Sequence, residues 1–416
     1  MSNSTASKRI ATDVTLQTIK SAMDTSNTKD EARNTLLGQI VAGIHALAGG
    51  SFDFSDWRNI SAMIRSGNVD KVPLGVIFKV THSVFGDLYF ITRARNQHPV
   101  SGEPTRPTVT IQSLYLLSLS GSPTTAKTFV YDRKEAFYSV TEAIPANTVC
   151  KFTTIEYGGW AAGTWNFTAT AQIAAGSKLC ISAYQDTALG SCKVQVFTDA
   201  KQTTPAAEYS ISSGAGSATK DLGTWGTDCN HPQRVSYGSN NEKESNFFQW
   251  LNSDAASFPD QWQPQTKFDM LDGGYAGMAG FLAGFPEDFR GALGLCAIPN
   301  VSNGVFESPD SAVHTNQKYE HNGYFFLPSR KEIYGSNESS YEADEVQFDY
   351  YKNVGTADRD KLMYAKGATG PTTCWLRTPY AGIANYVRIC YAGNGGALHS
   401  TSAIYANGAA LLAILA

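Results

Sequence analysis

The sequence predicts an α+β fold in which strands and loops outweigh helices. Only 17% of the 416 residues are charged, against roughly 25% in an average soluble protein, and Gly, Ser, Thr and Asn are abundant. Apolar and polar residues alternate in several segments, as they do in half-buried strands. Capping residues mark a few helices, most of which are short. A chain of this length suggests about two or three domains.

Residues 1–50 are predicted to form a helical segment. Thr28 and Glu31 form a capping box, in which the hydroxyl accepts a hydrogen bond from an early helical amide and the carboxylate reaches back to the cap. An apolar stripe at helical spacing follows, made of Leu37, Ile40, Ile44 and Leu47. Such a stripe packs either against its own domain or against a partner, and we assign the segment to assembly or docking.

Residues 51–123 are predicted to begin the main domain. Ser55 can cap a short helix that carries Trp57 and stops at Gly67. Strands are expected at 76–80, 88–92 and 109–117, which are rich in β-branched and aromatic residues and are separated by Gly, Asn and Pro. The predicted secondary structure therefore changes from helix to strand within this segment.

Residues 124–222 are predicted to be a β-rich, sandwich-like insertion. Residues 165–169 and 192–197 alternate between apolar and polar side chains, and Thr, Ala and Gly dominate the segment.

Residues 223–416 are predicted to form the carboxy-terminal domain, with short helices at recognisable caps. Ser245 precedes a compact amphipathic turn, and Pro286 occupies a typical first helical position. Ser329 and Glu332 form a second capping box, and Gly335 ends that helix.

Composition excludes several partners. A formal net charge of -4 without a Lys/Arg-rich tract argues against nucleic acid and anionic membrane surfaces. Residues 1–10 lack the apolar core of a secretory signal, and no stretch is long enough to span a membrane, so we expect synthesis in a reducing cytoplasm and no membrane insertion. Seven scattered cysteines indicate free thiols rather than a disulfide framework or a zinc site.

Catalytic and metal-binding motifs are largely missing from the sequence. Cys229 lies two residues from His231, a spacing that rarely makes a nucleophile and its base. A carboxylate cluster that could attract calcium is more typical of a solvated loop; its members are Glu342, Asp344, Glu345 and Asp349. We therefore expect no cofactor, no metal and no enzymatic activity.

The carboxy-terminal segment carries the most specific signal. From Cys374 to Ile414 the sequence reads CWLRTPYAGIANYVRICYAGNGGALHSTSAIYANGAALLAI. Upstream stand RVSYGSNNEKESNFFQWLNSDA, GFLAGFPEDFRGALG and FFLPSRKEIYG, in that order. Together these motifs resemble the variable proteins of diversity-generating retroelements, many of them phage-encoded, which have a C-type-lectin fold. The resemblance implies a lectin-like domain with a variable region at residues 375–414.

The resemblance also implies which positions vary. In such systems, adenines of a template are copied with errors, so Asn codons yield many residue types but never Lys, Glu, Gln, Met or Trp. The 25 residues from Ile383 to Asn407 contain none of these five types. The expected variable, ligand-binding positions are Ile383, Asn385, Tyr386, Arg388, Cys390, Tyr391, His399, Ser400, Thr401, Ser402, Ile404 and Tyr405.

The residue types in this segment suit a recognition surface independently of the resemblance. Tyr offers a large contact area at low entropic cost, while Ser and Asn adapt their hydrogen bonds. Trp375 and Arg377 are expected to brace the loops rather than touch a ligand. The expected supporting core consists of Trp375, Leu376, Val387, Ile389, Leu411 and Ile414. The alternative is an ordinary Gly/Ala/Tyr-rich tail that closes a sheet.

The sequence departs from the family's pattern in two respects. The family commonly ends in Gly-Val-Ala-Pro, whereas Gly408-Ala409-Ala410-Leu411 stands here. The tripeptides with which animal C-type lectins bind sugars through calcium are missing, so calcium-dependent sugar binding is not implied. Formylglycine-generating oxidases share the fold but need a reactive cysteine pair, which the sequence does not locate.

The resemblance implies a non-enzymatic virion protein that binds a protein or glycan on the surface of the host bacterium. Its partners would be that ligand, other virion proteins and two further copies in a homotrimer. One alternative is a head or tail decoration protein with a glycan-binding domain. Another is an enzyme that acts on polysaccharide, which would need a perturbed carboxylate pair in a cleft.

Overall fold

The computed structural model describes most of the chain from residue 53 to the carboxy terminus. The described residues are 53–132, 134–154, 163–183, 189–198, 205–225, 233–237, 240, 242–256, 278–302, 317–338, 346–352, 360–380, 386–394 and 396–416. The predicted helical segment at residues 1–50 lies outside them, as do Cys229, His231 and most of the acidic cluster.

Two segments from opposite ends of the chain build the central antiparallel sheet. Its strands are, in order across the sheet, β1 (Ile77–His82), β2 (Gly86–Arg95), β3 (Val109–Ser113), β22 (Leu412–Leu415) and β14 (Leu293–Gly294), with β17 (Phe325–Phe326) also paired to β22. The last strand therefore lies inside the sheet, between β3 and β14.

Strand β22 is buried on both faces. Leu411, Ala413 and Leu415 face one hydrophobic core, whereas Leu412 and Ile414 face another. A strand covered on both sides needs apolar residues at every position, which explains the uninterrupted run LLAIL.

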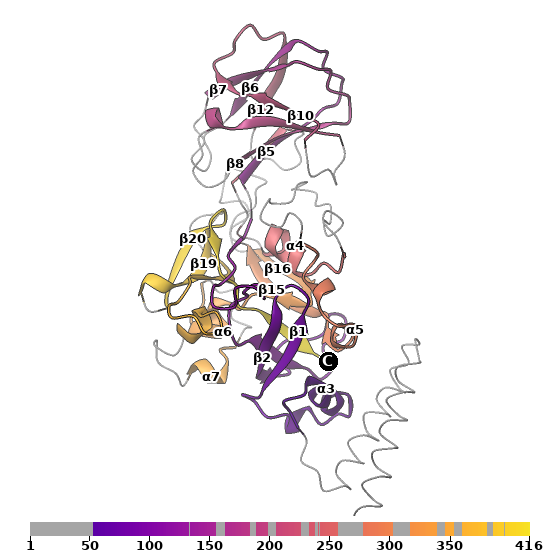
Figure 1. The fold of residues 1–416 in the computed structure, drawn as a ribbon, viewed down its shortest axis with the longest axis vertical. Helices are drawn as coiled ribbons and strands as arrows, with labels where there is room; N and C mark the ends of the chain where they lie inside the picture. The colour runs from indigo at the N-terminus through magenta and orange to yellow at the C-terminus, as the bar shows by residue number, and fades with distance from the viewer. Residues whose placement is uncertain are drawn as a thin grey trace, which may run out of the picture.

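The expected insertion forms two sheets packed around a core of their own, at one end of the long axis (Figure 1), together with residues 223–225 and 233–237 beyond its predicted boundary. The first sheet runs β10 (Ala207–Ser210), β9 (Lys193–Phe197), β8 (Lys178–Ala183), β5 (Lys134–Ser139) and β13 (Gln233–Tyr237). The second runs β11 (Ser212–Ser213), β7 (Gly163–Ala169), β6 (Thr148–Thr154) and β12 (Lys220–Trp225), with β12 parallel to β6.

Smaller sheets complete the main body. The long hairpin joins β15 (Cys296–Ser302) to β16 (Gln317–Gly323), and a short pair joins β4 (Phe129–Val130) to β21 (Ala406–Asn407). A three-stranded sheet contains β18 (Cys374–Pro379), β19 (Tyr386–Tyr391) and β20 (Ala397–Ser402). This last sheet holds most of the predicted variable positions.

The described helices are short. The α-helices are α3 (Trp57–Arg65), α4 (Asn246–Leu251), α5 (Glu287–Arg290), α6 (Arg330–Tyr334) and α7 (Asp349–Lys352). The 3-10 helices are η1 (Val69–Lys71), η2 (Leu189–Ser191), η3 (Glu242–Glu244), η5 (Leu282–Gly284), η7 (Asp360–Met363) and η8 (Ala392–Asn394). None of the described helices is long and apolar enough to cross a membrane.

The predicted α+β fold with a C-type-lectin-like domain is therefore wrong, because the described chain is β-rich. The longest described α-helix has nine residues, and the others amount to one or two turns between strands. Gly67, Gly291 and Gly335 stand at or just after the ends of α3, α5 and α6, and strand pairing rather than helix packing forms the layers.

Local cap predictions agree better with the structure. The Ser329–Glu332 capping box is confirmed, and Gly335 ends α6 in the left-handed conformation with φ +73°. Ser245 caps α4 as predicted. The cap of α3 is Asp56 rather than Ser55, because the Asp56 carboxylate accepts from the Arg58 amide.

An aromatic cluster in the main core surrounds a neutral histidine. The Val84 amide donates to Nδ1 of His82, so the ring proton resides on Nε2, 2.9 Å from the Phe281 carbonyl oxygen. Burial lowers the pKa of His82 to about 4. Gly284 is required here, since a Cβ atom would lie 2.0 Å from the imidazole ring.

A second buried feature is an ionic network centred on Glu332 of α6. Both carboxylate oxygens accept from the Arg377 guanidinium of β18, each at 2.8 Å. His98 Nε2 lies 2.7 Å from Oε1, and its Nδ1 lies 2.9 Å from the Thr110 hydroxyl of β3. Burial alone would raise the pKa of Glu332, but Arg377 and His98 hold it well below its usual range. The network joins α6, β18 and the central sheet.

Acidification is expected to destabilise the fold through His82. The unfolded histidine has a pKa of 6.5 and the folded one about 4, so stability is complete above pH 6.5 and is lost as pH falls toward 4. The full loss is roughly 3 kcal/mol. Urea titrations at several pH values should show that the unfolding free energies of the unaltered protein and a His82→Phe variant converge as the pH falls over this range. A difference in unfolding free energy that does not change with pH would contradict the assignment.

Replacing Glu332 is expected to be strongly destabilising. Glu332→Gln removes the carboxylate that accepts two hydrogen bonds from the buried Arg377 guanidinium, which costs about 3–5 kcal/mol of unfolding free energy. A Glu332→Gln/Arg377→Met double variant should recover part of that loss. The exposed Glu142, paired with Lys220 at 3.4 Å, offers the control Glu142→Gln, expected within about 0.5 kcal/mol. A loss below about 1 kcal/mol for Glu332→Gln would contradict the role of the network.

Candidate functional site

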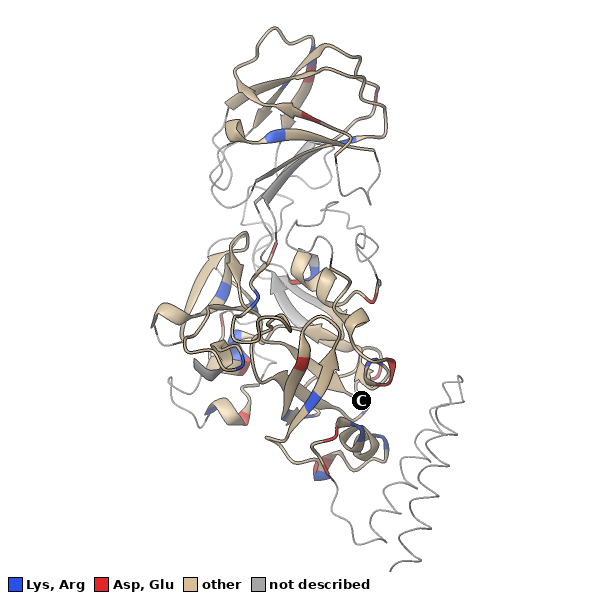
Figure 2. Ribbon diagram, in the orientation of Figure 1, with Lys and Arg blue, Asp and Glu red and all other residues tan. Residues whose placement is uncertain are grey.

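The candidate site is the three-stranded antiparallel sheet β18–β19–β20. Tyr386 pairs with Ser402 at one end of β19, and Tyr391 pairs with Ala397 at the other, next to the η8 turn. These two ends are roughly 17 Å apart at the usual rise of a strand. The chain here is poor in charge, because Arg388 is its only Asp, Glu, Lys or Arg between positions 383 and 407. Figure 2 accordingly shows the β19–β20 hairpin almost entirely in tan.

Strand β18 forms the rigid base of this sheet. All six of its residues are buried. The Trp375 indole donates to the Phe129 carbonyl oxygen at 2.8 Å, and Arg377 belongs to the Glu332 network. Both side chains brace the sheet from inside, as predicted. The whole predicted supporting core is buried as well: Trp375, Leu376, Val387, Ile389, Leu411 and Ile414.

The predicted variable positions differ widely in exposure. Tyr391, at 41%, and His399 are exposed. Partly buried positions are Tyr386, Arg388, Ser400, Thr401 and Tyr405. Buried positions are Cys390, Ser402 and Ile404, whose side chains contact the protein interior rather than the surface. Ile383 and Asn385 lie outside the described residues.

The accessible positions form two groups on opposite faces of the sheet. Side chains alternate along a strand, so Tyr386 and Arg388 face one side and Tyr391 faces the other. Register places Ser400 beside Arg388. The rings of Tyr391 and His399 contact each other at 5.3 Å between centroids.

The first group, which we call the Tyr386 group, consists of Tyr380, Tyr386, Arg388 and Ser400. The Arg388 guanidinium lies 4.5 Å from the centre of the Tyr380 ring, and the Tyr380 and Tyr386 rings are 6.3 Å apart. Together they make a partly exposed aromatic surface with one positive charge, the kind of surface that anchors protein interfaces. The second group, the Tyr391 group, consists of Tyr391 and His399.

Glu338 fixes the orientation of Arg388. Its carboxylate accepts two hydrogen bonds from the Arg388 guanidinium, at 2.7 and 2.8 Å, and also pairs with Arg330 of α6. This bidentate geometry aligns the guanidinium plane as well as its charge. Arg388 therefore presents a fixed face toward Tyr380.

Sequence reasoning missed Tyr380 and Glu338. Tyr380 directly follows the WLRTP motif and precedes the variable positions, so its place beside the motif was an available signal. Glu338 lies 50 residues before Arg388, in a polar segment after α6. No local pattern identifies a partner at that distance.

The structure also brings together two cysteines, of which the sequence assigned only Cys390, as a variable position. Cys374 and Cys390 are directly opposite each other on β18 and β19, and both are buried. The hydrogen bond with Cys390 and burial together raise the pKa of the Cys374 thiol well above its usual value. A protonated, inaccessible thiol is a poor nucleophile, so this pair lacks the properties of a reactive one.

No metal centre is found among the described residues. No three His, Cys, Asp or Glu side chains in that part of the chain gather closely enough to hold an ion. Of the acidic cluster, only Asp349 is described, and its carboxylate accepts from Lys352 at 2.7 Å. Glu332 is the carboxylate with the most strongly shifted pKa there, and it is buried against Arg377 rather than open to a cleft.

Comparison with known proteins finds one family. Residues 227–410 match a family described as a domain of unknown function, DUF6273. The matched segment contains β18–β20 and all the predicted variable positions. No curated protein and no solved structure matches the chain, so the lectin-like fold has no support from known structures.

Proposed function

We propose that the chain is a non-enzymatic binding protein whose β18–β20 sheet displays a recognition surface. In this proposal the protein is part of a phage virion, and its ligand is a protein or glycan on the surface of the host bacterium. The virion assignment rests on the resemblance of residues 374–414 to retroelement-diversified variable proteins.

The contrast between β18 and its neighbouring hairpin carries the proposal. Strand β18 is wholly buried and tied to the core by Trp375 and Arg377. Strands β19 and β20 instead place aromatic and hydroxyl side chains at or near the surface. Binding surfaces benefit from this arrangement, because a fixed backbone reduces the entropy lost when a partner binds.

The accessible side chains suit recognition of a protein or a glycan. Tyr386 and Tyr391 provide large rigid contacts, and Ser400, Thr401 and His399 provide adaptable hydrogen bonds. Their separation of roughly 17 Å along β19 lies within the span of an ordinary interface of about 800 Å² per partner. We infer that the two groups contact different parts of one ligand around the edge of the hairpin.

The proposal includes diversification by a retroelement. The missing Lys, Glu, Gln, Met and Trp between residues 383 and 407 agree with an origin in template Asn codons. Surface positions on a buried framework tolerate such changes best, since surface substitutions usually alter stability by less than about 0.5 kcal/mol.

We further propose assembly as a homotrimer with other virion proteins. Three copies of a weak site act together when they engage one surface, and their combined affinity exceeds that of a single site by orders of magnitude. The helical segment predicted at residues 1–50 would mediate this assembly.

Truncating the three tyrosines tests the binding function. A Tyr386→Ala/Tyr391→Ala/Tyr405→Ala variant should bind host cells about 30-fold less strongly or worse, because interface tyrosines commonly act as anchors. Binding of labelled protein to cells is measured against Tyr350→Ala, an exposed tyrosine on α7. Single Tyr386→Ala and Tyr391→Ala variants separate the two groups. Undiminished binding by a folded triple variant refutes the proposal.

Sequencing the gene across a population tests diversification. Substitutions should concentrate at the predicted codons, most freely at Tyr391 and His399, with a matching template repeat and a reverse transcriptase gene nearby. Positions Cys390, Ser402 and Ile404 should accept a narrower range of residues, because their side chains are buried. Variation spread uniformly along the gene would argue against this origin.

A further inference from the structure

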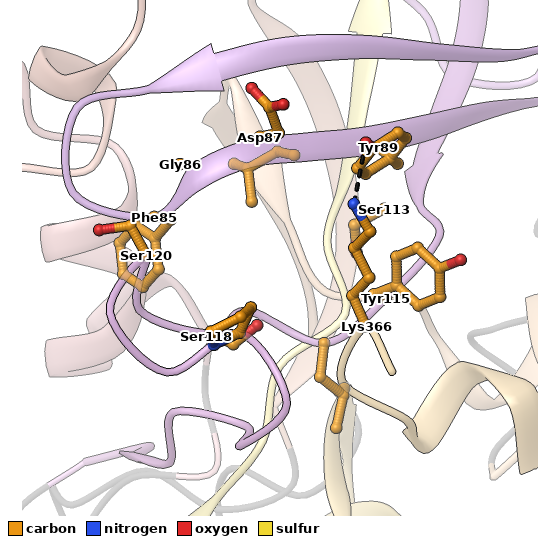
Figure 3. A pocket seen from close by; sticks show the side chains of 12 residues that line it. Phe85, Gly86, Asp87, Tyr89, Ser113, Tyr115, Ser118, Ser120 and Lys366 are labelled. Carbon is orange, nitrogen blue, oxygen red and sulfur yellow. Dashed lines mark hydrogen bonds between the residues drawn. The ribbon is translucent and has the colours of Figure 1, made fainter. Parts of the chain in front are cut away.

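A pocket of about 180 Å³ lies apart from the candidate site, between β2 and the segment that follows β3. Figure 3 shows its walls: Phe85 and Gly86 at one end, Tyr89, Tyr115 and Lys366 at the other, and serines along one side. None of its lining residues is a predicted variable position. At about 30 Å³ per water molecule, the volume matches roughly six waters, or one small organic molecule.

The backbone builds this pocket with a close approach at Gly86. Gly86 has φ +67°, and a Cβ atom there would lie 3.2 Å from Cβ of Ser120. The Ser120 amide donates to the Val84 carbonyl oxygen at 3.2 Å, which holds the serine segment against the β1–β2 turn. The wall therefore belongs to the ordered part of the fold.

One exposed positive charge, Lys366, lies at the pocket, and it is close enough to the Asp87 carboxylate to help lower the pKa of that group. Lys366 Nζ donates to the Tyr89 hydroxyl at 2.9 Å and lies 4.2 Å from the centre of that ring. Within the described chain, no carboxylate is in ion-pair contact with it. Asp87 accepts from Lys79 at 2.9 Å and from Thr81 at 2.8 Å, and Figure 3 shows its carboxylate on the side of β2 away from the pocket.

The other walls combine hydroxyl groups with apolar surface. The Ser118 hydroxyl makes no hydrogen bond within the described residues, which leaves it able to bind a ligand, whereas Figure 3 shows the Ser120 hydroxyl pointing away from the pocket. Leu88 and Leu116 provide an apolar floor. The Tyr115 ring stands at 85° to that of Tyr89, with centroids 6.1 Å apart, and offers a flat side.

We propose that this pocket binds a sugar acid, a single hydroxylated ring that carries a carboxylate. The carboxylate pairs with Lys366, a ring hydroxyl bonds to Ser118, and an apolar face of the ring lies against Tyr115. A neutral sugar would offer Lys366 no ion-pair partner inside the pocket. An amino acid would bring an ammonium group that no inward-facing carboxylate meets. The pocket is independent of the proposed recognition sheet.

Ligand titrations with the full-length protein test this proposal. D-Glucuronate should bind saturably in the millimolar range, and D-glucose and acetate at least tenfold more weakly, because a charge-assisted hydrogen bond and the ring contacts must act together. Methyl β-D-glucuronide represents the end of a glycan chain. Its binding would indicate a glycan source, and exclusive binding of free glucuronate would indicate a free sugar acid; either result supports the proposal.

Matched variants assign the binding to the pocket. Lys366→Met keeps the length of the side chain and should weaken glucuronate binding at least tenfold, whereas Ser118→Ala should weaken it a few-fold. Lys193→Met, which removes an exposed lysine from the insertion, should leave binding unchanged. Equal binding of glucose and glucuronate, undiminished binding by Lys366→Met, or no saturable binding by the unaltered protein would overturn the proposal.

Discussion

The buried Glu332 carboxylate is the constraint on which the arrangement of the candidate site depends. It accepts hydrogen bonds from Arg377 of β18, from His98 before β3 and from the Ser329 amide at the start of α6. A charge with no solvent contact must keep all its partners, since losing one leaves an uncompensated charge inside the protein. The three elements are therefore held in one relative position, and this fixes where the β18–β20 sheet lies relative to α6 and the central sheet.

This rigidity separates the support of the hairpin from its surface. The side of β19 that carries Val387 and Ile389 packs into the core that also contains Trp375 and strands of the central sheet. Tyr391 and His399 lie on this same face, nearer the end of the hairpin where both side chains are exposed, and their rings contact each other. Substitution at the exposed Tyr391 is expected to cost the fold little, whereas substitution at Ile404 must refill a buried site.

Sequence patterns predicted the parts of the structure that local interactions determine. The Ser329 and Ser245 caps and the buried framework of Trp375 and Leu376 follow from neighbouring residues, and the structure confirms them. The fold class was wrong, because capped helices of one or two turns have clear sequence signals yet contribute little to the layers. The pairing of β22 with β3 joins residues about 300 positions apart, and no local pattern specifies it. The division of the predicted site between two faces likewise depends on strand register, which a variable sequence with weak alternation does not reveal.

The Glu338 carboxylate explains how the framework can accept change at Arg388. Glu338 pairs with both Arg330 and Arg388, and its side chain is only 6% exposed. If Arg388 were the sole partner, every other residue there would leave a buried charge unpaired and would cost several kcal/mol. Because Arg330 comes from α6 and lies outside the variable positions, Glu338 keeps a counterion whatever residue occupies position 388. Glu338 thus orients Arg388 when arginine occupies position 388, and it stays paired with Arg330 when another residue does. Replacing this partly exposed residue therefore need not destabilise the core.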